Sequence, residues 1–275
     1  MANKLVIGNW KMNGSRQSNT EFLSKFLAPL DQLENVDVAV CPPAIYLEQL
    51  AGLVVQSPIH LGAQNLSESE QGAFTGEISG SMLRDFGCHY VLVGHSERRS
   101  LNGETNALVA AKFKAALNAG LTPVLCVGET LDQRRDGETL NVVNDQLQAV
   151  LDAVGVEELG KGVIAYEPVW AIGTGETATP QQAQEVHQHI RRYIAEISPE
   201  VARTTRILYG GSVKGDNAAE LFSQPDIDGG LVGGASLDAH SFLSICRAGQ
   251  SRQLLSHEGG CVPARQFKPF QENSK

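Results

Sequence analysis

The sequence lacks long hydrophobic runs and clusters of basic residues. No apolar segment approaches the ~20 residues that are needed to span a bilayer. The formal net charge is −9, whereas nucleic acids and anionic membranes are bound by positively charged surfaces. We therefore expect neither nucleic-acid nor membrane binding. We also expect no secretory signal in MANKLVIGNW (1–10), which is typical of a strand.

Cysteine is scarce and scattered. The five cysteines are Cys41, Cys88, Cys126, Cys246 and Cys261. Their number is odd and none is in Cys-x-x-Cys spacing, so the pattern favours neither a disulfide framework nor a structural zinc site. This usage is typical of a reducing compartment and predicts a cytoplasmic protein.

What the chain does have is a series of short segments rich in Val, Ile and Leu. Eight such segments cover residues 4–9, 36–41, 59–64, 90–94, 122–128, 162–167, 206–211 and 229–234. They are continuously apolar and do not alternate with polar residues. Such strands are typical of a parallel sheet that is buried on both faces.

Amphipathic segments with helix signals lie between the predicted strands. Residues 104–119 end at a glycine, residues 180–196 begin with a capping pattern of Thr179 and Gln182, and residues 238–248 stop at a glycine. Eight strand–helix units in about 250 residues predict one closed, parallel (β/α)8 barrel of class α/β. A doubly wound open sheet is the alternative.

The domain organisation follows from where the repeat of strand–helix units ends. The barrel is expected over residues 1–249. Residues 250–275 show neither helical nor strand periodicity, so we expect an irregular C-terminal tail. Residues 64–79 also interrupt this repeat, because they are long for a strand-to-helix loop.

The active site of a parallel barrel lies at the carboxyl ends of its strands. The residues at those ends with chemically useful groups are Asn9, Lys11, His95, Glu167, Ser212, Gly233 and Gly234. Together they offer one base, one imidazole, one ammonium group and three donors suited to a phosphate. The glycine-rich loops YGGSV (209–213) and LVGGAS (231–236) suit an anion because backbone N–H groups can surround it, although each could be only a tight turn.

Five motifs are GNWKMN (8–13), GHSERR (94–99), AYEPVWAIGTG (165–175), YGGSV (209–213) and GLVGGASL (230–237). Together they resemble the motifs of the triosephosphate isomerase family. They occur in the family's order on the predicted strands, and the resemblance covers residues 4–249. It implies a barrel enzyme that interconverts dihydroxyacetone phosphate and D-glyceraldehyde 3-phosphate through an enediolate, without a metal or an organic cofactor.

The resemblance also implies roles for individual residues. Glu167 would be the general base and His95 a neutral electrophile. Lys11 would supply positive charge, with Asn9 helping to place it and Glu97 as its partner. These roles fit the chemistry, since one carboxylate can move a proton between adjacent carbons while donors stabilise the charge on oxygen.

The phosphate would be bound by the backbone of Gly173 and by the donors around Ser212, Gly233 and Gly234. Residues 168–178 would form a lid, because a proline and an apolar run lead into flexible glycines. The long loop around Thr75 would dock into a second copy of the chain, so the resemblance also implies a homodimer.

Two other functions remain open from the sequence. One is another phosphate-binding barrel enzyme, such as an epimerase or an aldolase. An aldolase needs a Schiff-base lysine at a strand end, and Lys11 is the only near candidate. The other is a barrel that only binds a phosphorylated ligand without catalysis.

Overall fold

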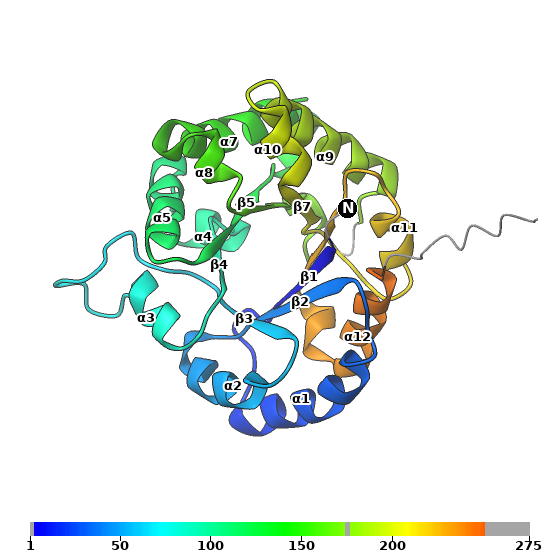
Figure 1. Cartoon of the computed structure of the whole chain (residues 1–275). Helices are drawn as coiled ribbons and strands as arrows, with labels where there is room; N and C mark the ends of the chain where they lie inside the picture. Colours follow the sequence, from blue (N-terminus) through cyan, green and yellow to red (C-terminus); the bar gives the residue numbers. More distant parts are fainter. Residues whose placement is uncertain (1–2, 174–176, 251–275) are drawn as a thin grey trace, which may run out of the picture.

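The protein is described by a computed structural model over residues 3–173 and 177–250. Eight parallel strands close into one barrel, in which each strand pairs with the next and β8 pairs with β1 (Figure 1). The strands are β1 (Lys4–Asn9), β2 (Val36–Cys41), β3 (Ile59–Ala63), β4 (Tyr90–Val93), β5 (Thr122–Val127), β6 (Val163–Tyr166), β7 (Arg206–Tyr209) and β8 (Gly229–Val232). The predicted closed barrel is confirmed, and the open-sheet alternative is wrong.

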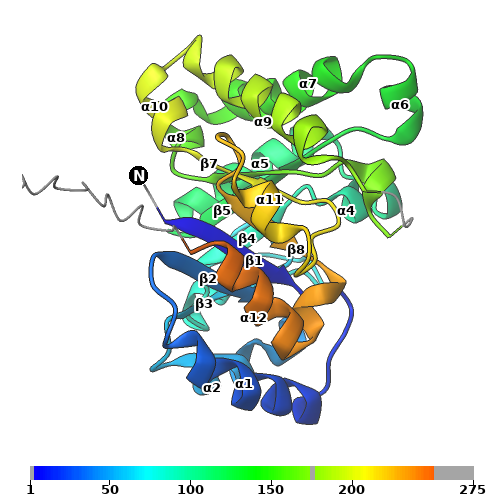
Figure 2. The ribbon, with the colours of Figure 1, turned by 90° about the vertical axis from the view of Figure 1, so that its right-hand side faces the viewer.

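Helices form a ring around the barrel (Figures 1 and 2). They are α1 (Arg16–Leu30), α2 (Leu47–Val54), α3 (Gly80–Asp85), α4 (Ser96–Leu101), α5 (Asn106–Asn118), α6 (Leu131–Arg135), α7 (Thr139–Val154), α8 (Val156–Leu159), α9 (Pro180–Ala195), α10 (Pro199–Thr204), α11 (Ala218–Phe222) and α12 (Ala239–Ala248), with short 3-10 turns η1 (Ala44–Tyr46), η2 (Val169–Ala171) and η3 (Gly234–Leu237). The predicted start of α9 is confirmed, since Thr179 and Gln182 form a reciprocal capping box.

The continuous apolar strands are explained by two layers of packing. Alternate strand residues such as Ile7, Leu92 and Leu208 fill the barrel interior. The residues between them pack outward against the helices. On the side of α1 and α12, for example, the rings of Phe26 and Phe242 stack with their centroids 5.2 Å apart. Because both faces of the strands are largely buried, neither face needs alternating polar residues.

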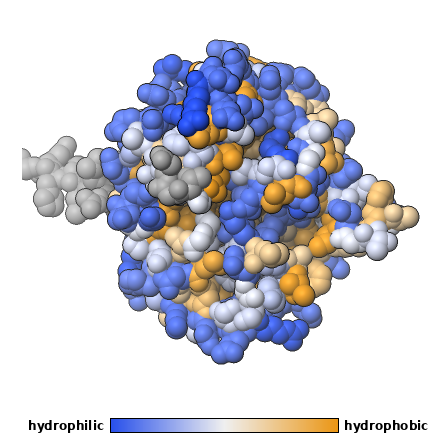
Figure 3. All heavy atoms as spheres, turned by 180° about the vertical axis from the view of Figure 1, so that it is seen from behind, coloured by the Kyte–Doolittle hydropathy of each residue, from blue (hydrophilic) through white to orange (hydrophobic). Residues whose placement is uncertain are grey.

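The carboxyl ends of the eight strands open on one face of the barrel. That face is seen in Figure 3, where hydrophilic side chains gather around its centre. The loop of residues 64–79 projects from the side of the barrel between β3 and α3 (Figure 1). None of the helices within residues 3–173 and 177–250 has both the length and the apolar character to cross a membrane. The predicted tail lies outside the described residues from residue 251 onward.

Candidate active site

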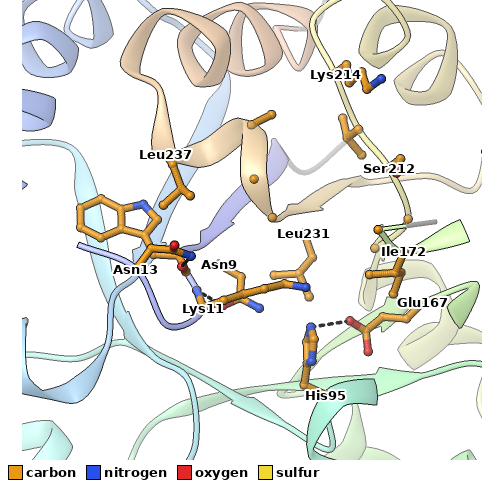
Figure 4. A pocket seen from close by; sticks show the side chains of 18 residues that line it. Asn9, Lys11, Asn13, His95, Glu167, Ile172, Ser212, Lys214, Leu231 and Leu237 are labelled. Atoms are coloured by element: carbon orange, nitrogen blue, oxygen red, sulfur yellow. Dashed lines mark hydrogen bonds and ion pairs between the residues drawn. The ribbon is translucent and has the colours of Figure 1, made fainter. Parts of the chain in front are cut away.

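A cavity of about 320 Å³ lies at the carboxyl ends of the strands. Its walls come from the segments that follow β1, β4, β6, β7 and β8 (Figure 4). The residues that line it are Asn9, Trp10, Lys11, Asn13, His95, Glu167, Ile172, Gly173, Gly210, Gly211, Ser212, Val213, Lys214, Leu231, Gly233, Gly234, Ala235 and Leu237. Barrel closure therefore gathers into one cavity residues that are up to 228 positions apart, from Asn9 to Leu237.

His95 and Glu167 lie side by side on one wall of this cavity (Figure 4). The Nε2 atom of His95 lies 2.9 Å from Oε1 of Glu167, and the backbone N–H of Ser96 donates to Oε2 at 2.9 Å. Both side chains are buried, with 6% of His95 and 2% of Glu167 exposed. The carboxylate is thus held out of water by two donors and faces the cavity.

The position of Glu167 depends on a neighbouring glycine. A Cβ atom added at Gly210 would lie 2.9 Å from Cγ of Glu167 and 3.0 Å from the Tyr166 carbonyl oxygen. Any side chain at position 210 would therefore push the carboxylate from its place. The glycines of the motif YGGSV therefore leave room for the Glu167 side chain. They also form the loop that suits an anion.

His95 caps the amino terminus of α4 in a way that fixes its tautomer. Its Nδ1 atom accepts a hydrogen bond of 3.2 Å from the Glu97 backbone N–H. A nitrogen that accepts from an N–H group carries no proton itself, so the ring proton lies on Nε2 and is donated to Glu167. The geometry corresponds to the neutral imidazole.

The two partners shift each other's pKa. Burial raises the pKa of Glu167, but the contacts with His95 and the Ser96 N–H lower it by more, so the carboxyl stays ionised. Burial lowers the pKa of His95, whereas the Glu167 carboxylate raises it, and the net direction is upward. A second ring proton would still have to displace the Glu97 N–H from Nδ1.

Lys11 adopts a backbone conformation that is unusual for a residue with a side chain, with φ = 52°. Two side chains hold it there: Oδ1 of Asn9 accepts from the Lys11 N–H at 3.1 Å, and Nε2 of Gln64 donates to the Lys11 carbonyl at 2.8 Å. The ammonium group extends into the cavity (Figure 4) and lies 2.5 Å from Oε1 of Glu97. Strain of this kind is concentrated at functional sites.

Glycine-rich loops form the opposite wall. Ser212 follows β7 and donates from its hydroxyl to the Ala171 carbonyl at 3.1 Å, which ties this loop to the segment after Glu167. Gly233 and Gly234 follow β8, and the carbonyl of Gly233 accepts from the N–H of Ser236 at 2.8 Å in the turn η3. Gly173 has φ = 69°, a conformation in which glycine is favoured.

A second buried carboxylate, Glu129, lies behind the cavity. It accepts hydrogen bonds from the Tyr166 hydroxyl at 3.1 Å and from Nε1 of Trp170 at 2.9 Å, and it pairs with Arg134 at 3.1 Å. The Arg134 guanidinium also stacks 4.5 Å from the centroid of the Trp170 ring. This cluster fastens the start of the predicted lid to the barrel.

The cavity brings together all but one of the predicted catalytic and phosphate-binding residues. Asn9, Lys11, His95, Glu167, Gly173, Ser212, Gly233 and Gly234 line it. Glu97 does not line it, but contacts Lys11 from a neighbouring cavity of about 290 Å³. Within the predicted lid, residues 174–176 lie outside the described residues.

Sequence reasoning missed several residues of the cavity wall. Asn13, Lys214, Leu231 and Leu237 line it without having been singled out. Asn13 closes the motif GNWKMN and Lys214 directly follows YGGSV, so the motifs contained a signal for both. Leu231 could have been found from the inward alternation of β8.

The family of the chain follows from comparison with known proteins. The profile of the family "Triosephosphate isomerase" matches residues 4–249. Curated proteins of that name from Dechloromonas aromatica and Nitrosococcus oceani are 59% and 56% identical over 248 residues, which is 90% of this chain and 99% of each relative. One from Thiobacillus denitrificans is 58% identical over the same shares. The chain therefore belongs to the triosephosphate isomerase family.

Proposed function

We propose that Glu167 and His95 carry out the proton transfers of triose phosphate isomerisation. Membership of the family makes this chain an enzyme that interconverts dihydroxyacetone phosphate and D-glyceraldehyde 3-phosphate. The observation that supports the assignment is the buried pair itself, with Nε2 of His95 2.9 Å from Oε1 of Glu167 on one wall of the cavity.

Glu167 acts as the base for both halves of the reaction. Its carboxylate removes a proton from the carbon next to the substrate carbonyl, which leaves an enediolate, and returns the proton to the neighbouring carbon. One carboxylate suffices because the two carbons are adjacent. Burial favours this role, since a carboxylate held away from water is poised to accept a proton from carbon.

His95 and Lys11 stabilise the negative charge that grows on the substrate oxygens. The Nε2–H group of His95 now points to Glu167, and a substrate oxygen between the two would take over this donor. Lys11 brings a positive charge into the same cavity, placed by Asn9 and Glu97. Donors aimed at a developing oxyanion typically contribute about 3–4 kcal/mol each.

The phosphate is held at the glycine-rich wall. The backbone of Gly173, Gly233 and Gly234, with the segment at Ser212, surrounds an anion without requiring further side-chain charge. Lys11 lies on the side of the cavity that faces these loops (Figure 4). The phosphate of the substrate thus lies at the glycine-rich loops, while its reacting carbons lie next to Glu167.

A second copy of the chain completes the assembly that we propose. Met12 is 95% exposed and Phe74 is 51% exposed, and both are apolar. Met12 lines the cavity of about 290 Å³ beside Lys11 and His95, which would receive the partner's loop around Thr75. A homodimer would bury these apolar side chains.

The aldolase alternative is not favoured by Lys11. An aldolase needs a Schiff-base lysine at a strand end, whereas Lys11 lies two residues beyond the last residue of β1 and its side chain forms an ion pair. The ammonium of Lys11 lies 2.5 Å from Glu97.

A coupled assay with dihydroxyacetone phosphate tests the proposal. The wild-type chain should form D-glyceraldehyde 3-phosphate, and Glu167→Gln should lower kcat by about 10²–10⁴-fold or more. Glu157→Gln, at an exposed position on α8, is the matched control and should keep wild-type turnover. Near-normal kcat in Glu167→Gln would refute Glu167 as the base.

A further inference from the structure

Two buried polar atoms behind the cavity have no hydrogen-bond partner among the described residues. They are Nε2 of His187, in α9, and the hydroxyl of Tyr209, at the end of β7. The helix α9 packs outside β7 (Figures 1 and 2), and the two rings lie with their centroids 6.3 Å apart at an angle of 41°. Leaving a buried donor and a buried acceptor both unpaired is costly.

His187 is a hydrogen-bond acceptor at this position. Its Nδ1 atom lies 3.2 Å from the Asp226 carbonyl oxygen, which can only accept, so Nδ1 carries the ring proton. The Nε2 atom therefore presents a bare lone pair. The side chain is fully buried, and burial lowers its pKa to about 3. His187 remains neutral, and Nε2 remains an acceptor, at any pH at which the enzyme would work.

Tyr209 is the complementary donor. Burial raises the pKa of its hydroxyl to about 12, so the proton stays in place. Tyr166 encloses the histidine from another side, with its ring edge-on at 5.8 Å from the His187 ring, and its own hydroxyl is already bonded to Glu129. Tyr209 is thus the available donor among the aromatic neighbours of Nε2.

The Tyr209 hydroxyl touches the segments that carry the catalytic groups. A Cβ atom added at Gly211 would lie 2.2 Å from this hydroxyl and 3.0 Å from Cγ of Pro168. Pro168 directly follows Glu167. The backbone N–H of Ala178 points to the hydroxyl oxygen. It lowers the pKa of Tyr209 and so offsets part of the increase that burial causes. The hydroxyl therefore lies where Pro168 and Ala178 meet the loop after β7 that contains Gly211.

We propose that His187 is a positioning residue for the isomerase reaction. Its Nε2 accepts a hydrogen bond from the Tyr209 hydroxyl through one bridging water, and so fixes the hydroxyl against Gly211 and Pro168. This role rests on the proposed function of Glu167, because its consequence is the alignment of the segment that begins at that residue. His187 itself does not touch the substrate cavity.

The test uses two substitutions that keep different halves of the imidazole. His187→Asn places an amide near the Nδ1 position and keeps a donor for Asp226, but removes the acceptor at Nε2. His187→Gln reaches the Nε2 position and can restore that acceptor. Loss of one hydrogen bond predicts a fall in kcat of about three- to tenfold for His187→Asn, with little change in KM, and a smaller fall for His187→Gln.

A double-mutant cycle separates this role from a merely structural one. In a Tyr209→Phe background, His187→Asn should cause no further loss of kcat, because the interaction is already gone. Equal losses in both backgrounds, or a loss of thermal stability with wild-type kcat, would overturn the proposal. A wild-type chain without isomerase activity would refute the proposed function instead.

A spectroscopic measurement keeps the test decisive if the His187 variants fail to fold. The ¹⁵N resonance of His187 Nε2 reports whether its lone pair accepts a hydrogen bond. It should shift between the wild type and Tyr209→Phe, while the Nδ1 resonance stays in place. An unchanged Nε2 resonance would show that the two side chains do not interact.

Discussion

The fully buried carboxylate of Glu129 accepts a hydrogen bond of 2.9 Å from Nε1 of Trp170, 41 residues further along the chain. Because Trp170 lies three residues after Glu167, this bond fixes the exit of the chain from the catalytic strand. The Arg134 guanidinium lies over the indole ring, 4.5 Å from its centroid. The start of the predicted lid is therefore held by an acid from the loop after β5 and a cation from α6.

A substitution of Trp170 tests how much its hydrogen bond to Glu129 contributes to stability. Trp170→Phe keeps an aromatic ring beside Arg134 but removes the N–H donor to Glu129. We expect the free energy of unfolding to fall by about 1.5–3 kcal/mol, the range for a hydrogen bond to a charged group. Denaturant titration measures it. Unchanged stability would mean that the bond contributes nothing in solution.

A buried ion cluster predicts a pH-dependent contribution to stability. Glu104 contacts both Arg98 and Lys112 at 2.6 Å, and the ammonium of Lys112 also donates to Asn65 at 2.8 Å. Burial raises the pKa of Glu104, but its two cationic partners lower it below the ordinary value of 4.5. The carboxylate therefore stabilises the fold above that value, and this stabilisation is lost as the pH falls through the lowered pKa.

Glu104→Gln should lower the free energy of unfolding at pH 7 by about 3–5 kcal/mol, because the buried ammonium of Lys112 and the partly exposed guanidinium of Arg98 lose their partner. The difference from the wild type should stay constant at neutral pH and shrink as the pH falls below 4.5. Glu157→Gln, on the surface, should show neither effect. A difference that persists unchanged into acid would contradict the ion-pair assignment.

The proposed dimer depends on the projecting loop. Thr75→Arg places a charge and a long side chain at its exposed tip, which should prevent the loop from entering the partner's cavity. We expect monomers in sedimentation experiments and lower turnover. Gln56→Arg adds the same charge at an exposed position before β3 and should leave the assembly intact. A wild-type chain that sediments as a fully active monomer would rule out the dimer.

The barrel domain is proposed to work without the tail. The family match ends at residue 249, and α12 closes the ring of helices at Ala248. A chain truncated after Gly249 should therefore keep its kcat/KM. A loss of more than about 1–2 kcal/mol in the free energy of unfolding would show that the tail packs against the barrel.

Much of the fold could be predicted because burial on both faces leaves a simple signal. Each predicted strand starts within one residue and ends within two residues of the observed one. The start of α9 could be placed from Thr179 and Gln182, since a capping box is local. Closure of the sheet then follows from repetition of the strand–helix unit, and closure brings the strand ends together.

The parts that could not be predicted depend on contacts between distant segments. The positive φ of Lys11 could not be predicted, because besides its neighbour Asn9 it is stabilised by Gln64 from another loop. Glu129 looks like an ordinary loop acid, yet it is fully buried beneath Trp170 and Tyr166. Such pairings arise from how the loops fold back over the barrel, and they leave no periodic pattern in the chain.

The most direct measurement of the role of Glu167 follows solvent deuterium into the product. Dihydroxyacetone phosphate is incubated in D₂O, and the product is examined by proton NMR. The wild type and Glu157→Gln should introduce deuterium at the carbon that receives the proton, because the carboxylic acid of Glu167 exchanges with solvent between the two transfers. Glu167→Gln should incorporate deuterium more slowly by about 10²–10⁴-fold. Incorporation by Glu167→Gln at the wild-type rate would show that another group removes the proton.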